Sequence, residues 1–255
     1  MTQTTKPQAK PQNEEIQLPL AAPMLLSFVA GYVDSYTYLA LFGLFVAQVT
    51  SSFVIAGAEI ITHDYNVTGK LLVTVIFIFA AALTAALIIW AGKTNRATLP
   101  AMLALEAILL AVFCAMILFG PPISNATDWH GIVAGLVAAS AMGAQSVLVR
   151  QLMKGIPQTN VMTGNMTQLG IAVTDLAVAW RKLKRSRHSA EDEHEFVTVR
   201  DQLLVVLSVA LGFLFGAAAG AVAFATTGMR GAVLAVVIVT LLALWALLRQ
   251  RSAAH

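Results

Sequence analysis

The chain has 255 residues, of which 58% are apolar and 11% charged. Soluble domains have roughly 45 to 50% apolar and about 25% charged residues, so this composition excludes an ordinary soluble globular protein. The formal net charge is only +3, and the single cysteine, Cys114, excludes an intramolecular disulfide and a cysteine-rich metal site. The apolar residues form runs of about 20, long enough to cross ~30 Å of hydrocarbon as helices, which predicts an all-α, multi-pass membrane protein.

A polar leader precedes the first apolar run. Residues 1–22 contain Pro7, Pro11 and Pro19, and they lack the basic region, short apolar stretch and small-residue cleavage site of a secretory signal. We expect a disordered polar tail here, followed by a single integral membrane domain over residues 23–250.

Apolar segments follow one another along the rest of the chain. They cover residues 24–43, 45–61, 69–91, 98–119, 130–150, 159–179, 202–225 and 231–248. The second and sixth segments differ from the others because they carry several Thr, Ser, Asn and Gln side chains. The sixth includes the stretch NVMTGNMTQLG. Such segments are poor candidates for facing lipid.

The two halves of the chain align as an internal repeat, residues 24–119 and 130–249. AGYVDS in the first half falls on AMGAQS in the second, so Asp34 corresponds to Gln145. VTSSFVIAG then falls on MTGNMTQLG with the spacing kept. The simplest explanation is duplication of one four-segment unit.

The distribution of Lys and Arg favours six crossings over eight. If all eight segments crossed, the 16 basic residues would divide 11 to 5 between the two sides. If the second and sixth segments enter and leave on one side, they divide 14 to 2. Cytoplasmic loops are enriched in Lys and Arg, so we predict about six transmembrane helices, both termini in the cytoplasm and a cytoplasmic loop over residues 181–201.

Six crossings have a further consequence for the repeat. Three crossings per unit would invert the second copy, as in many secondary transporters. Re-entrant backbone is tolerated at membrane depth only inside protein or along a water-filled cavity. We therefore expect segments 45–61 and 159–179 to be half-inserted and to face each other near the midplane. The rival arrangement is a parallel repeat of eight helices.

Some residues of these segments are candidates for a transport pathway or substrate site. They are Asp34, Glu106, Gln145, Thr163, Gly164, Asn165 and Gln168. An ionisable group in an apolar run costs at least about 2.5 kcal/mol on insertion scales, so Asp34 and Glu106 should face the interior. Asp34 would handle a proton or cation, contact the substrate, or form a structural hydrogen bond to Tyr38 or Gln145.

Two readings also stay open for Glu106 and for the sixth segment. Glu106 would be a proton-relay group, or a neutral acid bonded to a backbone carbonyl. A break at Gly164 would free backbone groups to bind a solute, whereas the same small and polar residues also serve as packing contacts between membrane helices.

No enzymatic motif is present. The chain lacks a His-rich ligand spacing, a phosphate-binding glycine loop and a glycine-flanked serine elbow, so we expect no enzyme activity, no cofactor and no metal. The basic tract RKLKRSRH is typical of a loop that touches anionic headgroups, not of nucleic-acid binding.

Two functions are consistent with these features. The leading hypothesis is a transporter or channel for an unknown small solute or ion in the lipid bilayer. The alternative is a non-transporting scaffold or sensor that binds a partner through its basic cytoplasmic loop. The sequence leaves the oligomeric state open, and a homo-oligomer is compatible with it.

The same stretches resemble the YoaK-like bacterial membrane proteins, the family of domain of unknown function 1275. The resemblance rests on AGYVDSYTYLALFGLFVAQVTSS, and on AMGAQSVLVRQL followed by TNVMTGNMTQLG, and it covers roughly residues 24–249. The chain departs from the family pattern at residues 49–52, where Met-Thr-Gly-Asn is replaced by VTSS. The resemblance implies a protein of the bacterial inner membrane with about six helices and no established biochemical function.

Overall fold

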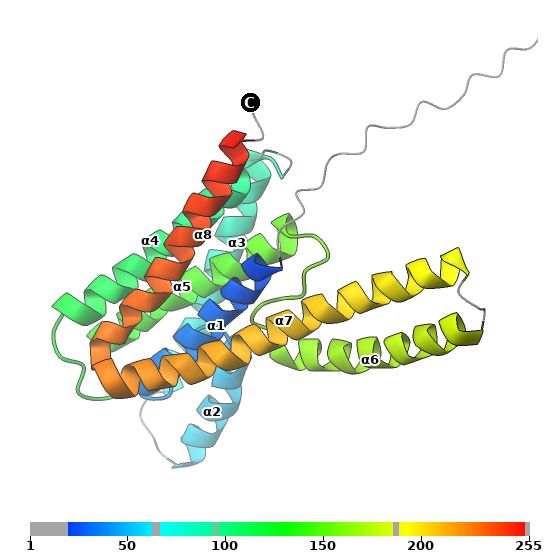
Figure 1. Ribbon diagram of the computed structural model, residues 1–255. Coiled ribbons are helices and arrows are strands. Elements are labelled where there is room, and N and C mark those ends of the chain that lie inside the picture. The colour runs from blue at the N-terminus through cyan, green and yellow to red at the C-terminus, as the bar shows by residue number, and fades with distance from the viewer. Residues whose placement is uncertain (1–19, 63–66, 94, 96, 186–188, 253–255) are drawn as a thin grey trace, which may run out of the picture.

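The computed structural model describes residues 20–62, 67–93, 95, 97–185 and 189–252. All regular secondary structure in these ranges is helical (Figure 1). The elements in chain order are α1 (Ala21–Ala40), α2 (Val49–Thr62), α3 (Val67–Ala91), α4 (Thr98–Phe119), α5 (Trp129–Leu152), α6 (Met162–Arg185), α7 (Ala190–Thr227), the short 3-10 helix η1 (Gly228–Ala232) and α8 (Val233–Ser252). Most of the predicted polar tail lies outside the described residues.

Within the described residues, four helical runs are long and apolar enough to cross a membrane. They are α3, α4, α5 and the run Ala190–Ser252, which contains α7, η1 and α8. The predicted all-α membrane protein is therefore confirmed. The bounds of α4 coincide with the predicted segment 98–119 because polar residues and glycine flank a continuous apolar run on both sides.

Most of the stretch 181–201, predicted as a cytoplasmic loop, is helical. α6 continues through Arg185, and α7 begins at Ala190 with the Ser189 side chain accepting a hydrogen bond from the Asp192 N–H. Acidic residues fill the first turn of α7, where they favour a helix N-terminus. Lys182 of α6 pairs with Asp192 at 3.0 Å. The charged stretch is thus a helical hairpin that projects from the other helices (Figure 1).

Glycines allow α1 and α7 to pack very closely, and this is the most extensive helix pair of the fold. Gly212, Gly216 and Gly220 lie four residues apart on α7 and face α1. A Cβ atom added at Gly216 would lie 2.0 Å from the carbonyl oxygen of Phe28. Small residues at this spacing let membrane helices approach backbone to backbone. The contact keeps α1 inside the protein.

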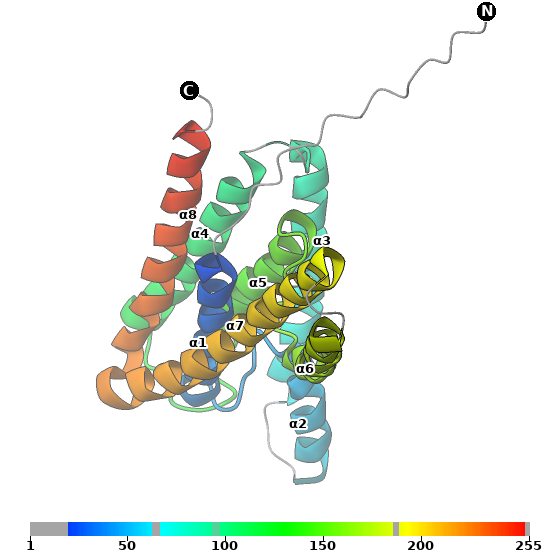
Figure 2. The same cartoon turned by 45° about the vertical axis from the view of Figure 1, so that its right-hand side comes forward.

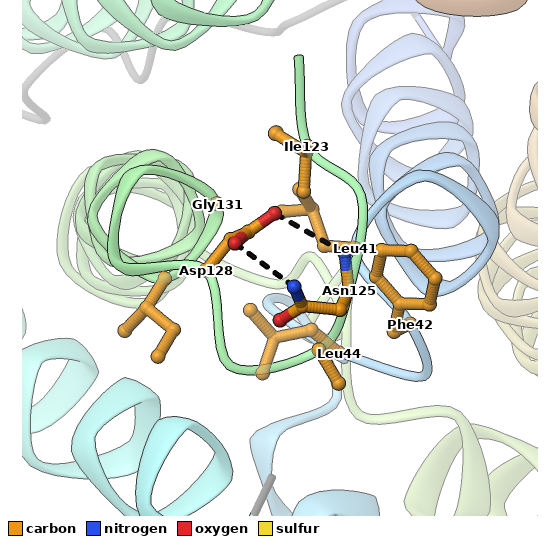
Figure 3. A pocket seen from close by; sticks show the side chains of 9 residues that line it. Leu41, Phe42, Leu44, Ile123, Asn125, Asp128 and Gly131 are labelled. Carbon is orange, nitrogen blue, oxygen red and sulfur yellow. Dashed lines mark hydrogen bonds between the residues drawn. The ribbon is translucent and has the colours of Figure 1, made fainter. Parts of the chain in front are cut away.

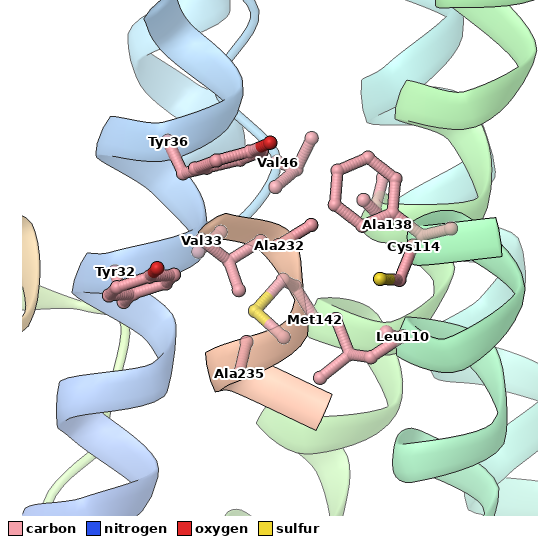
Figure 4. Packing of buried hydrophobic residues seen from close by; sticks show 14 of the residues in the cluster. Tyr32, Val33, Tyr36, Val46, Leu110, Cys114, Ala138, Met142, Ala232 and Ala235 are labelled. Atoms are coloured by element: carbon pink, nitrogen blue, oxygen red, sulfur yellow. The ribbon is translucent and has the colours of Figure 1, made fainter. Parts of the chain in front are cut away.

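Two tyrosines of α1 fix the sharp turn between α7 and α8. Figure 4 shows Tyr32 and Tyr36 among the buried apolar side chains of the main core, and their ring centroids lie 6.2 Å apart. Tyr32 Oη donates a hydrogen bond to the Gly231 carbonyl at 2.7 Å, and Tyr36 Oη donates to the Met229 carbonyl at 2.9 Å. Away from water these carbonyls need protein donors, so the two hydroxyls hold η1 and the start of α8 against α1.

The connection between α4 and α5 packs on the turn that follows α1 (Figure 3). Asp128 accepts hydrogen bonds from the N–H groups of Ser124 and Asn125 at 2.6 and 3.1 Å. These donors hold the pKa of the Asp128 carboxyl below its usual value. Leu41 and Leu44, from the turn after α1, line a small pocket together with Asn125 and Asp128. The α4–α5 connection therefore packs against this turn and stabilises it.

Candidate functional site

The carboxylate of Asp34 anchors the segment between α1 and α2. The chain turns at Gly43, whose φ of 84° suits glycine, and brings the next residues to Asp34. Oδ1 accepts hydrogen bonds from the N–H groups of Val46 and Ala47 at 2.8 and 2.7 Å, and Oδ2 accepts one from Gln48 at 3.0 Å. These N–H groups lie just before α2 and have no helical carbonyl partner. Asp34 thus supplies the acceptors that allow α2 to begin inside the protein.

The side chains of Gln145 and Ser146 on α5 hold the segment between α5 and α6. Gln145 Nε2 donates to the Leu26 carbonyl of α1 at 2.6 Å and lies 3.1 Å from Thr159 Oγ1. Asn160 Nδ2 lies 2.6 Å from Ser146 Oγ. Asp34 and Gln145, which correspond in the predicted repeat, therefore bind two separate segments, and no hydrogen bond joins them in the part of the chain described.

The two connecting segments meet at Asn160. Its Nδ2 lies 3.3 Å from the Ala47 carbonyl oxygen, so the segment before α6 contacts the segment before α2. Ser27 of α1 adds a third link, because its Oγ lies 3.0 Å from the Thr159 carbonyl and 2.7 Å from the Val209 carbonyl of α7. We name this region the junction. Its residues are Asp34, Ala47, Gln145, Ser146, Thr159 and Asn160.

Two amide oxygens of the junction have no hydrogen-bond donor among the described residues. They are Gln145 Oε1 and Asn160 Oδ1, and both atoms are buried. The orientation of Gln145 is fixed, because a flipped amide would place its oxygen against the Leu26 carbonyl, which can only accept. The Ala47 carbonyl selects the same orientation for Asn160. An unpaired buried acceptor costs about 1–3 kcal/mol, so both oxygens are suited to a bound cation or hydrogen-bond donor.

Glu106 lies apart from the junction. It is in the middle of α4, fully buried, and neither carboxyl oxygen has a hydrogen-bond partner among the described residues. No hydrogen bond or ion pair in those ranges connects it to Asp34 or Gln145. The predicted bond to a backbone carbonyl is also absent there. Glu106 is therefore a buried ionisable group of α4 that is separate from the junction.

The remaining predicted residues lie on the first turns of α6. Asn165 is 3% exposed and donates to the Gln158 carbonyl at 2.6 Å, so it shapes the segment that carries Asn160. Thr163, Gly164 and Gln168 are exposed. α6 runs through Gly164 without a break, so no backbone groups are freed there.

The sequence reasoning missed a buried ion pair between α2 and α3. Lys70 is fully buried and pairs with Glu59, whose second carboxyl oxygen has no partner in the described residues. Lys70 is one of the 16 basic residues whose distribution was used to predict membrane orientation. The available signal was the eleven-residue separation from Glu59, which brings the two side chains together when α2 packs on α3.

A metal centre finds no support in the described ranges, where no group of three or more His, Cys, Asp or Glu side chains is placed to hold an ion. The junction itself offers neutral amide, hydroxyl and carbonyl oxygens around one carboxylate. Each oxygen of that carboxylate already accepts a backbone N–H group, whereas the two amide oxygens accept none among the described residues.

The family of the chain follows from a match over nearly its whole length. The family model described as "Protein of unknown function (DUF1275)" matches residues 22–246, a range that includes both connecting segments of the junction. The chain belongs to this family. The resemblance seen in the sequence is thereby confirmed. No curated protein and no solved structure matches the chain.

Proposed function

We propose that this DUF1275 protein is a transporter or channel for a small solute that carries hydrogen-bond donors or a positive charge. The observation that carries the proposal is the pair of buried, unpaired amide oxygens of Gln145 and Asn160 at the meeting point of two non-helical segments. Irregular backbone at membrane depth is tolerated where it is enclosed by protein or lines a pathway. Transporters commonly bind their substrates at such interrupted segments near the bilayer midplane.

Six helices cross the membrane in this proposal, namely α1, α3, α4, α5, α7 and α8. Two observations support half-insertion of the others. α2 has 14 residues, so at 1.5 Å per residue it reaches about 21 Å, less than the ~30 Å of the hydrocarbon core. α6 is long enough to cross, but its first turns expose Thr163 and Gln168 and its last turn is basic, whereas α1, which like α6 is not among the candidate spans, packs along α7. Both termini and the tip of the α6–α7 hairpin then lie in the cytoplasm of a bacterial inner membrane.

The junction also supports an inverted repeat. In the first half, Asp34 binds backbone 12 to 14 residues further along the chain. In the second half, Gln145 and Ser146 each contact a residue 14 positions further along. In both halves, at the aligned positions, a polar side chain on a crossing helix thus holds the segment that precedes a half-inserted helix.

The residues have distinct roles in this mechanism. Gln145 and Asn160 contact the solute, whereas Asp34 and Asn165 position the two segments. Thr163, Gly164 and Gln168 line the exposed start of α6, which faces the cytoplasmic approach. Glu106 is separate from the solute and exchanges a proton that couples transport to a proton gradient. Both solute-binding oxygens are buried in this conformation, so the solute enters when α2 or α6 moves relative to α5.

Flux through proteoliposomes tests the proposal. We would follow glycerol and urea by light scattering and methylammonium by an internal pH dye. The variant Gln145→Leu removes the fixed acceptor, and Asn160→Leu removes the second. Each should lower the flux of the transported probe by about tenfold or more, the effect of losing one hydrogen bond of about 1.5 kcal/mol. Ser140→Ala is the matched control, because within the described ranges Ser140 Oγ donates to the Leu136 carbonyl of its own helix and to no group of the junction.

Two results would overturn the proposal. One is wild-type protein that moves none of the probes, nor Na⁺ or K⁺, under any imposed gradient. The other is equal flux in wild type and in both junction variants.

The alternative function, a scaffold that works through its charged hairpin, has one observation in its favour. The α6–α7 hairpin extends away from the other helices (Figure 1), and Lys184 and Arg185 near its tip are exposed. The double variant Lys184→Gln/Arg185→Gln separates the two functions. A transporter keeps both its flux and its cellular phenotype after this change. A scaffold loses its cellular phenotype.

A further inference from the structure

An apolar groove lies between α4 and α8, away from the junction. Its volume is about 600 Å³, and both views of the fold show the two helices side by side (Figures 1 and 2). Ala97, which directly precedes α4, and the α4 alanines Ala101 and Ala104 leave the space open on one side. Leu244 and other apolar residues of α8 form the other side, and Gln250 lies at one end.

The groove has the length of a lipid acyl chain. Along α4 it extends over residues 97–111, which at 1.5 Å per residue is about 21 Å. One leaflet of a ~30 Å hydrocarbon core is about 15 Å thick. A chain that enters at the membrane surface can therefore lie in the groove over its full length. The aromatic side chain of Trp90, which is 87% exposed close to the same end, marks that surface.

The end of the groove at the membrane surface is basic. Lys93 lies four residues before Ala97, and Arg249 and Arg251 flank Gln250. Lys93 and both arginines are exposed. α8 contains no acidic residue, and the one acid of α4, Glu106, is fully buried. The Oε1 atom of Gln250 is buried without a donor among the described residues. This end therefore suits a negative group accompanied by a hydroxyl donor.

We propose that this groove is a specific site for an anionic phospholipid with a hydroxylated headgroup, such as phosphatidylglycerol. One acyl chain lies between the alanines of α4 and the leucines of α8. The phosphate lies near Lys93 and Arg251, and a headgroup hydroxyl donates to Gln250 Oε1. Basic pockets between membrane helices on the cytoplasmic side commonly bind anionic headgroups. The proposal is independent of the solute pathway, because no junction residue lines the groove.

Native mass spectrometry of the full chain in detergent tests the site, with phosphatidylglycerol and phosphatidylcholine of identical acyl chains as probes. Wild type should retain one phosphatidylglycerol in preference to phosphatidylcholine. Lys93→Gln/Arg251→Gln should weaken phosphatidylglycerol binding about thirty-fold, because each basic residue near an anionic membrane surface contributes a factor of about five. Ala101→Leu/Ala104→Leu should weaken binding of that lipid about tenfold by filling the groove.

Two control variants make the result specific. Arg230→Gln removes a basic residue at the opposite end of α8, and Ala82→Leu/Ala86→Leu adds the same bulk to exposed positions of α3. Both should bind phosphatidylglycerol like wild type. Equal retention of the two lipids by wild type would overturn the proposal. So would a groove-filling variant that binds phosphatidylglycerol normally while converting a dimer into a monomer, because that result would assign the groove to a second copy of the chain.

Discussion

Replacing Asp34 tests whether this residue is an anchor or a solute ligand. Its carboxylate accepts three backbone hydrogen bonds in the junction, and bonds to a charged group contribute about 1.5–3 kcal/mol each. Asp34→Ala should therefore lower the free energy of unfolding by about 5 kcal/mol, a large share of the ~5–15 kcal/mol typical of folded proteins. Asp34→Asn keeps one acceptor oxygen for Val46 and Ala47 but turns an N–H₂ group toward the Gln48 N–H. A loss of about 2–3 kcal/mol is expected for it.

Denaturant unfolding in mixed micelles, followed by tryptophan fluorescence, measures these losses. Asp128→Asn is the control, because Asp128 also accepts backbone hydrogen bonds but lies in an exposed loop, and it should change the unfolding midpoint far less. The reasoning is refuted if Asp34→Asn unfolds at the wild-type midpoint and nevertheless abolishes flux. That result would make Asp34 a contact of the solute instead of a support for α2.

Three further substitutions probe the packing and the buried charges. Gly216→Ala should destabilise the protein by about 1–3 kcal/mol, because the new Cβ would meet the Phe28 carbonyl at 2.0 Å. Gly57→Ala is the control and should not destabilise it, because a Cβ there would have no neighbouring atom within 4 Å among the described residues. Equal unfolding midpoints for the two variants would contradict the α1–α7 contact. Lys70→Met should cost about 3 kcal/mol by leaving Glu59, whose side chain is 15% exposed, without its partner. Adding Glu59→Gln should restore most of that stability, and a double variant no better than the single one would argue against the pair. Glu106→Leu should raise the unfolding free energy by about 1–3 kcal/mol, because both carboxyl oxygens are unpaired, whereas a lowered value would reveal a partner for Glu106.

The helices themselves could be predicted because their causes are local. A continuous apolar run between polar or glycine-containing flanks specifies a spanning helix, and the predicted segments 69–91 and 98–119 nearly coincide with α3 and α4. The helical structure within residues 181–201 was not predicted. There the helix depends on the Ser189 cap and on ion pairs between Lys182 and the start of α7, whereas the sequence was interpreted mainly by charge and hydropathy.

The junction could be predicted only in part. Asp34 and Gln145 stood out because polar groups in an apolar run need partners. Their actual partners are backbone groups of distant segments, such as the Val46 N–H and the Leu26 carbonyl, and no side-chain pattern identifies these. Ser27 was missed for the same reason, because its hydroxyl bonds only to carbonyls. The close α1–α7 packing had a visible signal in the four-residue spacing of Gly212, Gly216 and Gly220.

The most direct test of the proposed pathway is a cysteine-accessibility map in membrane vesicles of known orientation. In a Cys114→Ala background, Ser51→Cys would report on α2 and Thr163→Cys on the start of α6, with a membrane-impermeant maleimide added from one side at a time. Two oppositely inserted segments that meet at Asn160 predict that the α2 position reacts from the periplasmic side and the α6 position from the cytoplasmic side. Reaction of both positions from the same side, or of neither from any side, would contradict the pathway.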